Sequence, residues 1–436
     1  MEKELARVTE ICDGCRRCHR LCPSFDHMLD RVDAHEGDVA KVTSADYRRV
    51  VDLCWQCKLC FNHCPYTPPH RFDIDFPRLM LRAKAARTRD EGASRQDAWL
   101  GNVDAVGSLG SAMAPLSNWA NGFAPHRALM EAVVGIDRGR NLPRFHHKTF
   151  ARWFRERQKQ RERATGSAER RIHSGATPGG PRGGAPQHPP AQYDQHPVAF
   201  FFTCFVNYNE PQVGRDAVAV LERNGCTVAA PDQVCCGMPY LDGGDLEAAA
   251  RNARRNVDAL LPLVEQGAEV VVPQPTCSYV LKKEYTMLAP GAATEKVAAH
   301  TRDLFEYLAG RQREGTLATE FPGRGPGKVA YQMPCHLRAQ NMGYKTRDVL
   351  QLIPGTKVTV VERCTAMDGT WAMKKEFYPI SLEFARKAAR DMEAAEPTTY
   401  ATDCSMAALQ IEEVRGAKPA HPATLLREAY GLPEER

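Results

Sequence analysis

The residues with the clearest chemical potential are cysteines that stand in two short motifs near the start of the sequence. Both motifs read C-x2-C-x2-C-x3-C-P. The members are Cys12, Cys15, Cys18 and Cys22 in the first motif and Cys54, Cys57, Cys60 and Cys64 in the second. This is the spacing with which a chain wraps a cubane [4Fe–4S] cluster. Structural zinc, which favours pairs of C-x2-C, and a disulfide framework are the alternatives, but the spacing favours clusters and single-electron chemistry.

The two motifs are expected to exchange their last cysteines. In two-cluster ferredoxins the fourth cysteine of each motif ligates the other cluster. We therefore predict one cubane at Cys12, Cys15, Cys18 and Cys64, and a second at Cys22, Cys54, Cys57 and Cys60. Cations beside the motifs would either face solvent, dock a partner or raise the potential of an anionic cluster. These cations are Arg16, Arg17, His19, Arg20, Lys58 and His63.

The composition limits the kinds of partner and location. A net charge of +5 over 436 residues gives no reason to expect nucleic acid. The sequence contains no apolar run of about 18 residues, so no transmembrane helix is predicted. The first residues lack the apolar stretch of a signal peptide. Sixteen cysteines in such a chain are expected to be metal ligands in a reducing compartment. The expected location is the cytoplasm, either free or peripheral on the inner face of a membrane.

The elements that hold the motifs have a helical pattern. Thr43 and Asp46 resemble a capping box at the start of a helix that leads into the second motif. We expect an α-helical ferredoxin domain over residues 1–90. It resembles the type found in fumarate/succinate reductase and heterodisulfide reductase subunits.

A second helical segment is predicted over residues 91–163. Breaks are expected within this stretch at Pro115, Gly122, Pro125 and Pro143. Residues 101–120 are weakly amphipathic, and they either pack on their own domain or lie against a membrane or a partner. Residues 164–197 are rich in proline and glycine and are expected to be a linker.

The rest of the chain repeats one plan over residues 198–285 and 329–413. Apolar strands alternate with amphipathic helices, which predicts parallel βαβ units and an α/β fold. We divide this half into two domains, 198–318 and 328–436. The predicted strands are 198–203, 227–231 and 269–273 in the first copy, and 329–334, 358–362 and 398–402 in the second.

A cysteine follows each predicted strand. The cysteines are Cys204, Cys235, Cys236 and Cys277 in the first copy, and Cys335, Cys364 and Cys404 in the second. Because the carboxyl ends of parallel strands meet at one edge, each group is expected to converge. Buried single cysteines with a purely structural role are the alternative.

The second copy departs from the first at its central motif. Thr365 and Ala366 stand where the first copy has Cys236 and Gly237. Threonine is a poor iron ligand, and alanine disfavours the positive φ that glycine permits. This site is therefore expected to hold either a different cluster or none. His336 and Asp368 are candidates for a ligand other than cysteine.

Several phrases of the second half resemble one family. They are Cys235-Cys236-Gly237-Met238-Pro239, Pro275-Thr276-Cys277, Pro334-Cys335-His336-Leu337-Arg338 and Gly369-Thr370-Trp371-Ala372-Met373-Lys374. They resemble the CCG-domain iron–sulfur oxidoreductases, which include the B and D subunits of heterodisulfide reductase, the C subunit of anaerobic glycerol-3-phosphate dehydrogenase and lactate-utilisation protein A. Two ferredoxin motifs ahead of two CCG repeats are most similar to the glycerol-3-phosphate dehydrogenase member.

The resemblance implies a third cluster, held by the four cysteines of the first copy. In heterodisulfide reductases this is a noncubane [4Fe–4S] centre with a fifth thiol three residues after the last cysteine. Val280 occupies that position here, so a cubane and a noncubane centre both remain open. The three cysteines of the second copy would hold a further cluster only with another ligand.

The expected function is electron transfer. No G-x-G-x-x-G follows a strand, so neither flavin nor NAD is expected in this chain. We expect an oxidoreductase subunit that passes electrons from a flavin dehydrogenase partner to a quinone or another acceptor. The alternatives are a heterodisulfide-reductase-like enzyme that reduces a disulfide at the CCG cluster, and a redox-responsive structural protein.

Overall fold

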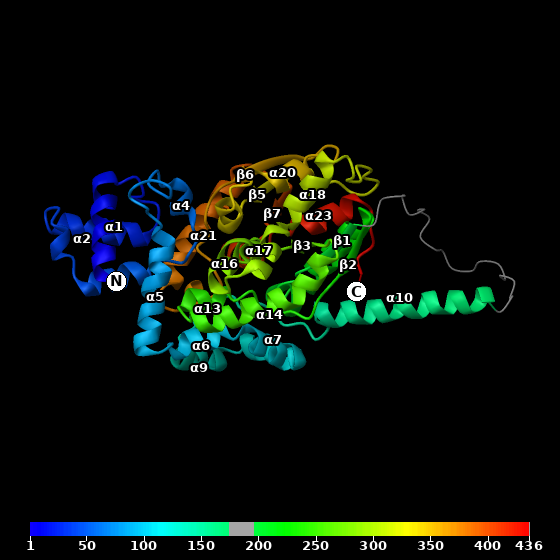
Figure 1. The fold of residues 1–436 in the computed structure, drawn as a ribbon, viewed down its shortest axis with the longest axis horizontal. Helices are drawn as coiled ribbons and strands as arrows, with labels where there is room; N and C mark the ends of the chain where they lie inside the picture. Colours follow the sequence, from blue (N-terminus) through cyan, green and yellow to red (C-terminus); the bar gives the residue numbers. More distant parts are fainter. Residues whose placement is uncertain (174–195, 436) are drawn as a thin grey trace.

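The first helices of the chain form a lobe at one end of the molecule, as the computed structural model shows for residues 1–173 and 196–435 (Figure 1). Its helices are α1 (Glu2–Cys15), α2 (Pro23–Ala34), α3 (Ser44–Asp52) and α4 (Leu59–His63). The capping box at the start of α3 is confirmed, because Asp46 N–H donates to Thr43 Oγ1 over 3.2 Å while the Asp46 carboxylate accepts from Thr43 N–H over 3.0 Å. The α-helical ferredoxin-like lobe that the sequence predicted is present.

Helix α5 links this lobe to a run of short helices. The run comprises α5 (Phe76–Glu91), α6 (Arg95–Gly101), α7 (Val103–Ala112), α8 (Ala114–Gly122) and α9 (Ala124–Val134). Pro115 and Pro125 stand in the first turns of α8 and α9. The backbone N–H that proline lacks would have no hydrogen-bond partner within the helix at these positions.

The predicted linker begins with helix rather than with irregular chain. Helix α10 (Phe150–His173) continues nine residues beyond position 164, because the sequence up to His173 is rich in alanine, glutamate and arginine and contains no proline. The rest of the predicted linker, residues 174–195, lies outside the described residues, and the next strand begins at His196.

The first repeat is a parallel sheet covered by helices. Its strands are β1 (His196–Phe200), β2 (Cys226–Ala229), β3 (Glu269–Val272) and β4 (Thr301–Asp303), in the order β2-β1-β3-β4. All three pairings are parallel. The helices are α11 (Cys204–Tyr208), α12 (Pro211–Arg223), α13 (Met238–Gly243), α14 (Leu246–Glu265), α15 (Pro275–Tyr279), α16 (Tyr285–Leu288), α17 (Ala292–Ala299) and α18 (Leu304–Arg313). Strand β4, only three residues long, was not predicted.

The second repeat has the same plan on a smaller scale. Its strands are β5 (Lys328–Gln332), β6 (Lys357–Val361) and β7 (Thr399–Ala401), paired in parallel in the order β6-β5-β7. Its helices are α19 (Cys335–Ala339), α20 (Lys345–Leu350), α21 (Tyr378–Glu393), α22 (Ser405–Arg415) and α23 (Pro422–Ala429). The predicted α/β repeats are therefore confirmed.

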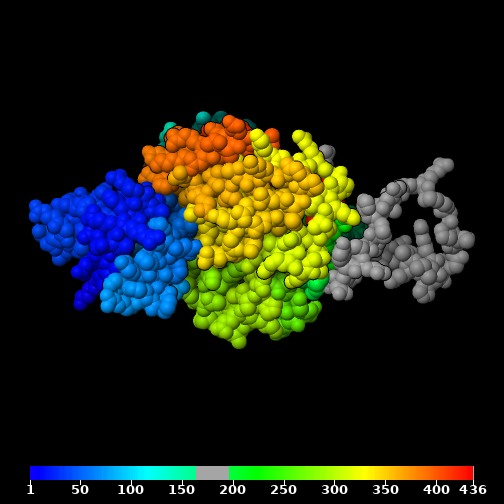
Figure 2. Space-filling model, turned by 90° about the horizontal axis from the view of Figure 1, so that it is seen from above, coloured from blue at the N-terminus to red at the C-terminus, as the bar shows by residue number. Residues whose placement is uncertain are grey.

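The two repeats share one apolar core. Phe200 and Val218 from the first repeat and Tyr331 and Leu426 from the second belong to a single cluster of buried side chains. Figure 2 shows the second repeat, in gold and orange, lying along the green first repeat, with the blue lobe at one end. This shared core fixes the two strand edges relative to each other.

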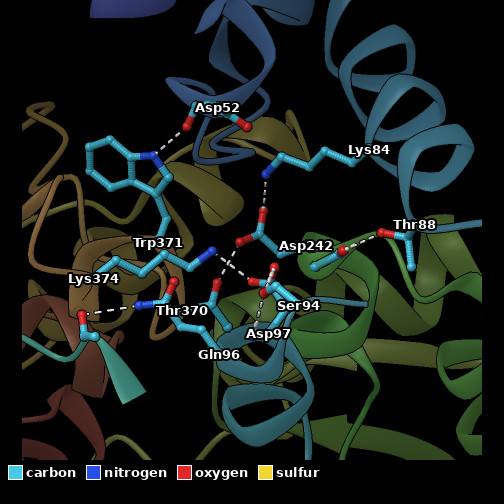
Figure 3. Close-up of polar contacts among 12 residues, drawn as sticks. Asp52, Lys84, Thr88, Ser94, Gln96, Asp97, Asp242, Thr370, Trp371 and Lys374 are labelled. Carbon is cyan, nitrogen blue, oxygen red and sulfur yellow. Dashed lines mark hydrogen bonds and ion pairs between the residues drawn. The ribbon is translucent and has the colours of Figure 1, made fainter. Parts of the chain in front are cut away.

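A buried ion pair joins the lobe to both repeats (Figure 3). Lys84 Nζ of α5 lies 3.0 Å from Asp242 Oδ1 of α13, and both side chains are at most 7% exposed. The second oxygen of Asp242 accepts a hydrogen bond from the Thr370 hydroxyl of the second repeat. Burial alone would raise the pKa of Asp242, but Lys84 and Thr370 outweigh it and hold this pKa below its usual range. Breaking the pair would leave a buried carboxylate without its counter-charge.

We expect Lys84→Met to lower the free energy of unfolding by about 3–5 kcal/mol, because an unpaired buried charge is strongly destabilising. The measurement is the urea midpoint of the iron-loaded protein. Arg89→Met, on the same helix, breaks the exposed pair with Asp90 and should leave the midpoint nearly unchanged. Equal midpoints for the Lys84→Met variant and the unmodified protein would contradict a stabilising role for this pair.

Candidate metal centres

Four cysteines of the lobe line one cavity. They are Cys12, Cys15, Cys18 and Cys64, and we call them the outer set. The first two lie on the last turn of α1, and Cys64 follows α4. Burial raises the pKa of Cys12 to about 12, and the three neighbouring thiols contribute to this shift. The cysteine that ends the second motif therefore lies with the first motif, as the spacing predicted, and the cavity suits a cluster held by four thiolates.

Three further cysteines, Cys22, Cys54 and Cys60, form the inner set. Burial raises the pKa of Cys60, and the nearby Cys54 and Cys22 thiols add to the effect. Gln56 Nε2 donates to the sulfur of Cys54 over 3.4 Å. The inner set therefore combines the last cysteine of the first motif with two cysteines of the second.

Cys57, predicted as the fourth member of the inner set, lies between that set and the second repeat, because Cys335 and Cys60 both add to its raised pKa. Its thiol hydrogen-bonds to the sulfur of Cys364 in the second repeat. Its backbone neighbours Gln56 and Lys58 both adopt left-handed conformations, with φ of 54° and 63°. Two such residues on either side of Cys57 shape the loop that carries it, and spacing alone does not predict this.

The first-repeat set, Cys204, Cys235, Cys236 and Cys277, converges at the carboxyl ends of β1, β2 and β3. Its thiols form a continuous chain of hydrogen bonds from Cys204 through the adjacent pair to Cys277. The pKa of each of the four thiols lies above the usual range. The hydrogen bond with Cys235 is the largest cause at Cys204, whereas at Cys277 the hydrogen bond with Cys236 lowers the pKa and burial outweighs it. Such thiols are protonated until a metal displaces the protons, which suits a ligand set. Val280 lies in the apolar core of this repeat and adds no fifth thiol.

Helix α7 covers the first-repeat set. The Asp104 carboxylate accepts a hydrogen bond from Cys235 N–H over 2.8 Å. Gly107 of α7 lies so close to the Tyr208 ring that a Cβ there would overlap it. Helix α7 belongs to residues 101–120, whose packing the sequence left open, and it packs against this site.

The second-repeat set, Cys335, Cys364 and Cys404, lines a cavity at the equivalent sheet edge. Thr365, His336, Asp368, Thr276 and Trp55 also line it. Hydrogen bonds from Cys335 and Cys57 lower the pKa of Cys364, and Trp55 adds to the effect. The buried indole N–H of Trp55 has no other acceptor among the described residues. A donor directed at sulfur in a cavity of thiols fits an anionic group, such as the sulfides and thiolates of a cluster.

The central turn of the first repeat is preserved in the second. Ala366 has a φ of 52° where Gly237 has 93°, so the expectation that alanine would resist this conformation is wrong. Ala366 N–H donates to Cys364 sulfur over 3.3 Å, as Gly237 N–H does to Cys235 over 3.5 Å. A left-handed alanine costs about 1–2 kcal/mol, and the buried surroundings maintain it.

Neither proposed non-cysteine ligand is free for a metal. His336 Nε2 lies 2.9 Å from the Gln56 carbonyl, and Nδ1 lies 2.9 Å from the Thr276 hydroxyl. Burial lowers the pKa of His336 to about 4, so the ring is neutral. One oxygen of Asp368 accepts from the backbone N–H groups of Thr370 and Ala372. His336 instead anchors the loop that carries Cys57.

The four sets lie in an order that sequence could not show. Cys18 of the outer set contributes to the raised pKa of Cys60 in the inner set, which burial chiefly causes. Cys57 bridges from the lobe to Cys364. Cys404 of the second-repeat set contributes to the raised pKa of Cys277, whose burial has the larger effect. The second-repeat set therefore lies near cysteines of both the lobe and the first repeat.

In the part of the chain that the structure describes, no three His, Cys, Asp or Glu side chains form a group that would hold one metal ion. A cluster places several irons between its thiolates and takes a wider arrangement of sulfurs.

Comparisons with known proteins agree with this organisation. The citrate utilization protein B Fer4-like domain matches residues 5–93, and the cysteine-rich CCG domain matches residues 198–282 and 329–412. The chain is 30% identical over 360 residues to the C subunit of anaerobic glycerol-3-phosphate dehydrogenase of Escherichia coli (strain K12), covering 82% of each protein. The resemblance inferred from the motifs is thereby confirmed.

Two more distant relatives share parts of the chain. The B subunit of fumarate reductase (CoM/CoB) of Methanothermobacter marburgensis is 28% identical over 223 residues, which is 50% of this chain and 42% of that protein. Lactate utilization protein A of Anoxybacillus flavithermus is 29% identical over 189 residues, 41% of this chain and 75% of that protein.

Cys236→Ala should remove about four irons per chain and one EPR signal, because it deletes one thiolate of the first-repeat set. The matched control is Cys226→Ala in the same repeat. Cys226 is buried at the start of β2, away from the cysteine edge, with its sulfur 3.4 Å from the Tyr307 hydroxyl. Iron analysis and EPR of anaerobically purified protein provide the measurement. An unchanged spectrum in Cys236→Ala would contradict the assignment of Cys236 as a ligand.

Proposed function

Because the chain belongs to the family of iron–sulfur oxidoreductase subunits that includes the C subunit of anaerobic glycerol-3-phosphate dehydrogenase, we propose that it passes electrons from a flavin-containing dehydrogenase subunit to a quinone or another acceptor. The observation that carries the proposal is the unbroken succession of cysteine sets from the end lobe to the first repeat.

The cofactors proposed for this route are two [4Fe–4S] clusters in the lobe and a third iron–sulfur cluster, cubane or noncubane, at the first-repeat set. Such clusters supply one-electron oxidation and reduction. The protein supplies thiols, several of them buried, and backbone N–H groups directed at sulfur. The N–H groups of Tyr66 and Gly237 point at Cys64 and Cys235, which favours the charged sulfur.

The outer set is the proposed entry for electrons. It lies in the lobe at one end of the molecule, where a partner has access (Figure 1). Arg17 Nε contacts His63 Nε2 over 3.4 Å on this exposed surface. Lys58 does not belong to it, because its side chain is 5% exposed and pairs with Glu284 of the first repeat over 2.9 Å. A flavoprotein would therefore meet the cations of the first motif.

The surface of helices α7–α9 is the proposed exit. One side of this segment covers the first-repeat set through Asp104. The other side exposes large apolar side chains: Leu109, Met113, Leu116, Trp119, Phe123, Leu129 and Val133. A patch of this kind marks an interaction surface. It suits a membrane surface or an apolar, quinone-reducing partner. None of the described helices is long and apolar enough to cross a membrane.

Direct reduction of a disulfide at the first repeat is less well supported. Cys235 and Cys236 are each 2% exposed, and α7 lies over them. A disulfide substrate would need contact with the site, whereas an electron crosses a covering helix. The burial therefore favours electron transfer.

Trp119→Glu should slow the reoxidation of the reduced protein by liposomes that contain a menaquinone analogue. We expect a slowing of about tenfold or more, because a carboxylate at the centre of the apolar patch must be desolvated on contact. The rate is followed by the return of cluster absorbance after dithionite has been removed.

Met287→Glu is the matched control, since Met287 is 40% exposed and apolar but lies on α16, outside the patch. Both variants should retain the full iron content. Equal reoxidation rates for Trp119→Glu and Met287→Glu would contradict the assignment of this exit.

A further inference from the structure

Two buried lysines lie beside the inner set, and each pairs with a carboxylate of the first repeat. Lys58 lies 2.9 Å from Glu284, and both side chains are at most 5% exposed. Lys84 forms the equally buried pair with Asp242 (Figure 3). A buried ion pair is weak evidence of stabilisation, because apolar side chains of similar volume often do as well. Two such pairs at one group of cysteines therefore point to a role for the charges themselves.

The ammonium groups lie closer to the cysteines than the carboxylates do. Lys84 Nζ donates to the Cys54 carbonyl over 3.1 Å. Burial chiefly raises the pKa of Cys54, and the opposing effect of Lys84 is larger than the contribution of Asp242. Lys58 also opposes the increase in pKa that burial causes at Cys60. Both lysines therefore present positive charge to the inner set.

The cations beside the outer set are exposed instead. Arg16 pairs with Asp13 and Asp33 at the surface, and its side chain is 40% exposed. Arg17 contacts His63 on the same exposed surface. Water and salt weaken the field of such charges, whereas charges in a buried environment act strongly on their neighbours. The two sets of the lobe therefore differ in the effective charge around them.

We propose that the buried ammonium groups of Lys58 and Lys84 raise the reduction potential of the inner-set cluster and thereby favour electron transfer to it from the outer set. One electron leaves the reduced outer cluster and enters the oxidised inner cluster, and no proton moves. The reduced inner cluster carries one more negative charge, which burial alone would disfavour and a nearby cation stabilises. This inference rests on the proposed function in taking both sets to hold clusters.

The pairing also explains why the carboxylates belong to another domain. Glu284 and Asp242 hold the two ammonium groups in place, and both come from the first repeat. The potential of a cluster in the lobe therefore depends on how the first repeat packs against it. Gln56 Nε2, which donates to the Cys54 sulfur over 3.4 Å, acts in the same direction as the lysines.

The test is a redox titration of the full chain, purified anaerobically and followed by EPR. The signal that Cys54→Ser alters identifies the inner cluster. Lys58→Gln should lower the reduction equilibrium constant of that cluster about tenfold, which is about 59 mV for one electron. Glu284→Gln should raise the same potential, because Lys58 keeps its charge and loses the opposing one.

The opposite signs separate charge from structure. Each of these variants leaves one buried partner unpaired, so a general loosening of the site would move both potentials in the same direction. Lys41→Gln is the matched control, since Lys41 lies in the lobe with its side chain 61% exposed. It should leave the inner potential unchanged.

Shifts of the same sign in Lys58→Gln and Glu284→Gln, or an unchanged inner potential in Lys58→Gln, would overturn the proposal. If Lys58→Gln does not assemble its clusters, Lys84→Met and Asp242→Asn provide the same comparison, with a fall and a rise expected in that order. Absence of every iron–sulfur signal from the unmodified protein would instead refute the proposed function itself.

Discussion

The buried ion pair between Lys84 and Asp242 is the contact on which the arrangement of the centres depends. Electron transfer requires that successive centres stay close, yet the cysteines belong to a helical lobe and two α/β repeats. Lys84 comes from α5, the helix that leads out of the lobe, Asp242 comes from the first repeat, and Thr370 of the second repeat donates to the same carboxylate. Lys84 also donates to the Cys54 carbonyl over 3.1 Å, so the pair reaches the inner set directly. One buried charge pair thereby connects α5, the first repeat and the second repeat.

The structure changes the role of the second repeat. The sequence left open whether its altered motif holds a different cluster or none. Cys364 faces Cys57 of the lobe, and Cys404 lies near Cys277 of the first repeat. In the proposed route the second-repeat set can therefore relay electrons between the lobe and the first-repeat set. The first-repeat set lies beyond it, under α7 and near the exposed apolar patch.

Much of this fold follows from local sequence. The alternation of strands and helices predicted the parallel repeats, and the capping residues Thr43 and Asp46 predicted the start of α3. Motif spacing placed Cys64 with Cys12, because a cubane fixes how far apart its ligands stand. The cysteines that follow the strands were expected to lie together, because the carboxyl ends of parallel strands meet at one edge of the sheet.

What sequence could not supply depends on contacts between distant residues. The loop that carries Cys57 contains left-handed Gln56 and Lys58, which contact His336 and Glu284 more than 200 residues away. The left-handed Ala366 is tolerated only because its surroundings fix the turn. The burial of Lys58, which the motif placed among candidate surface cations, has the same origin.

The order of the centres is the central claim, and the magnetic interaction between reduced clusters tests it most directly. Pulsed EPR of the dithionite-reduced protein measures which signals relax one another. The account predicts that the first-repeat signal couples to the second-repeat signal and not to the outer-set signal, and that Cys364→Ser removes this coupling. A first-repeat signal that couples to the outer set, or one whose relaxation is unchanged in Cys364→Ser, would contradict the account.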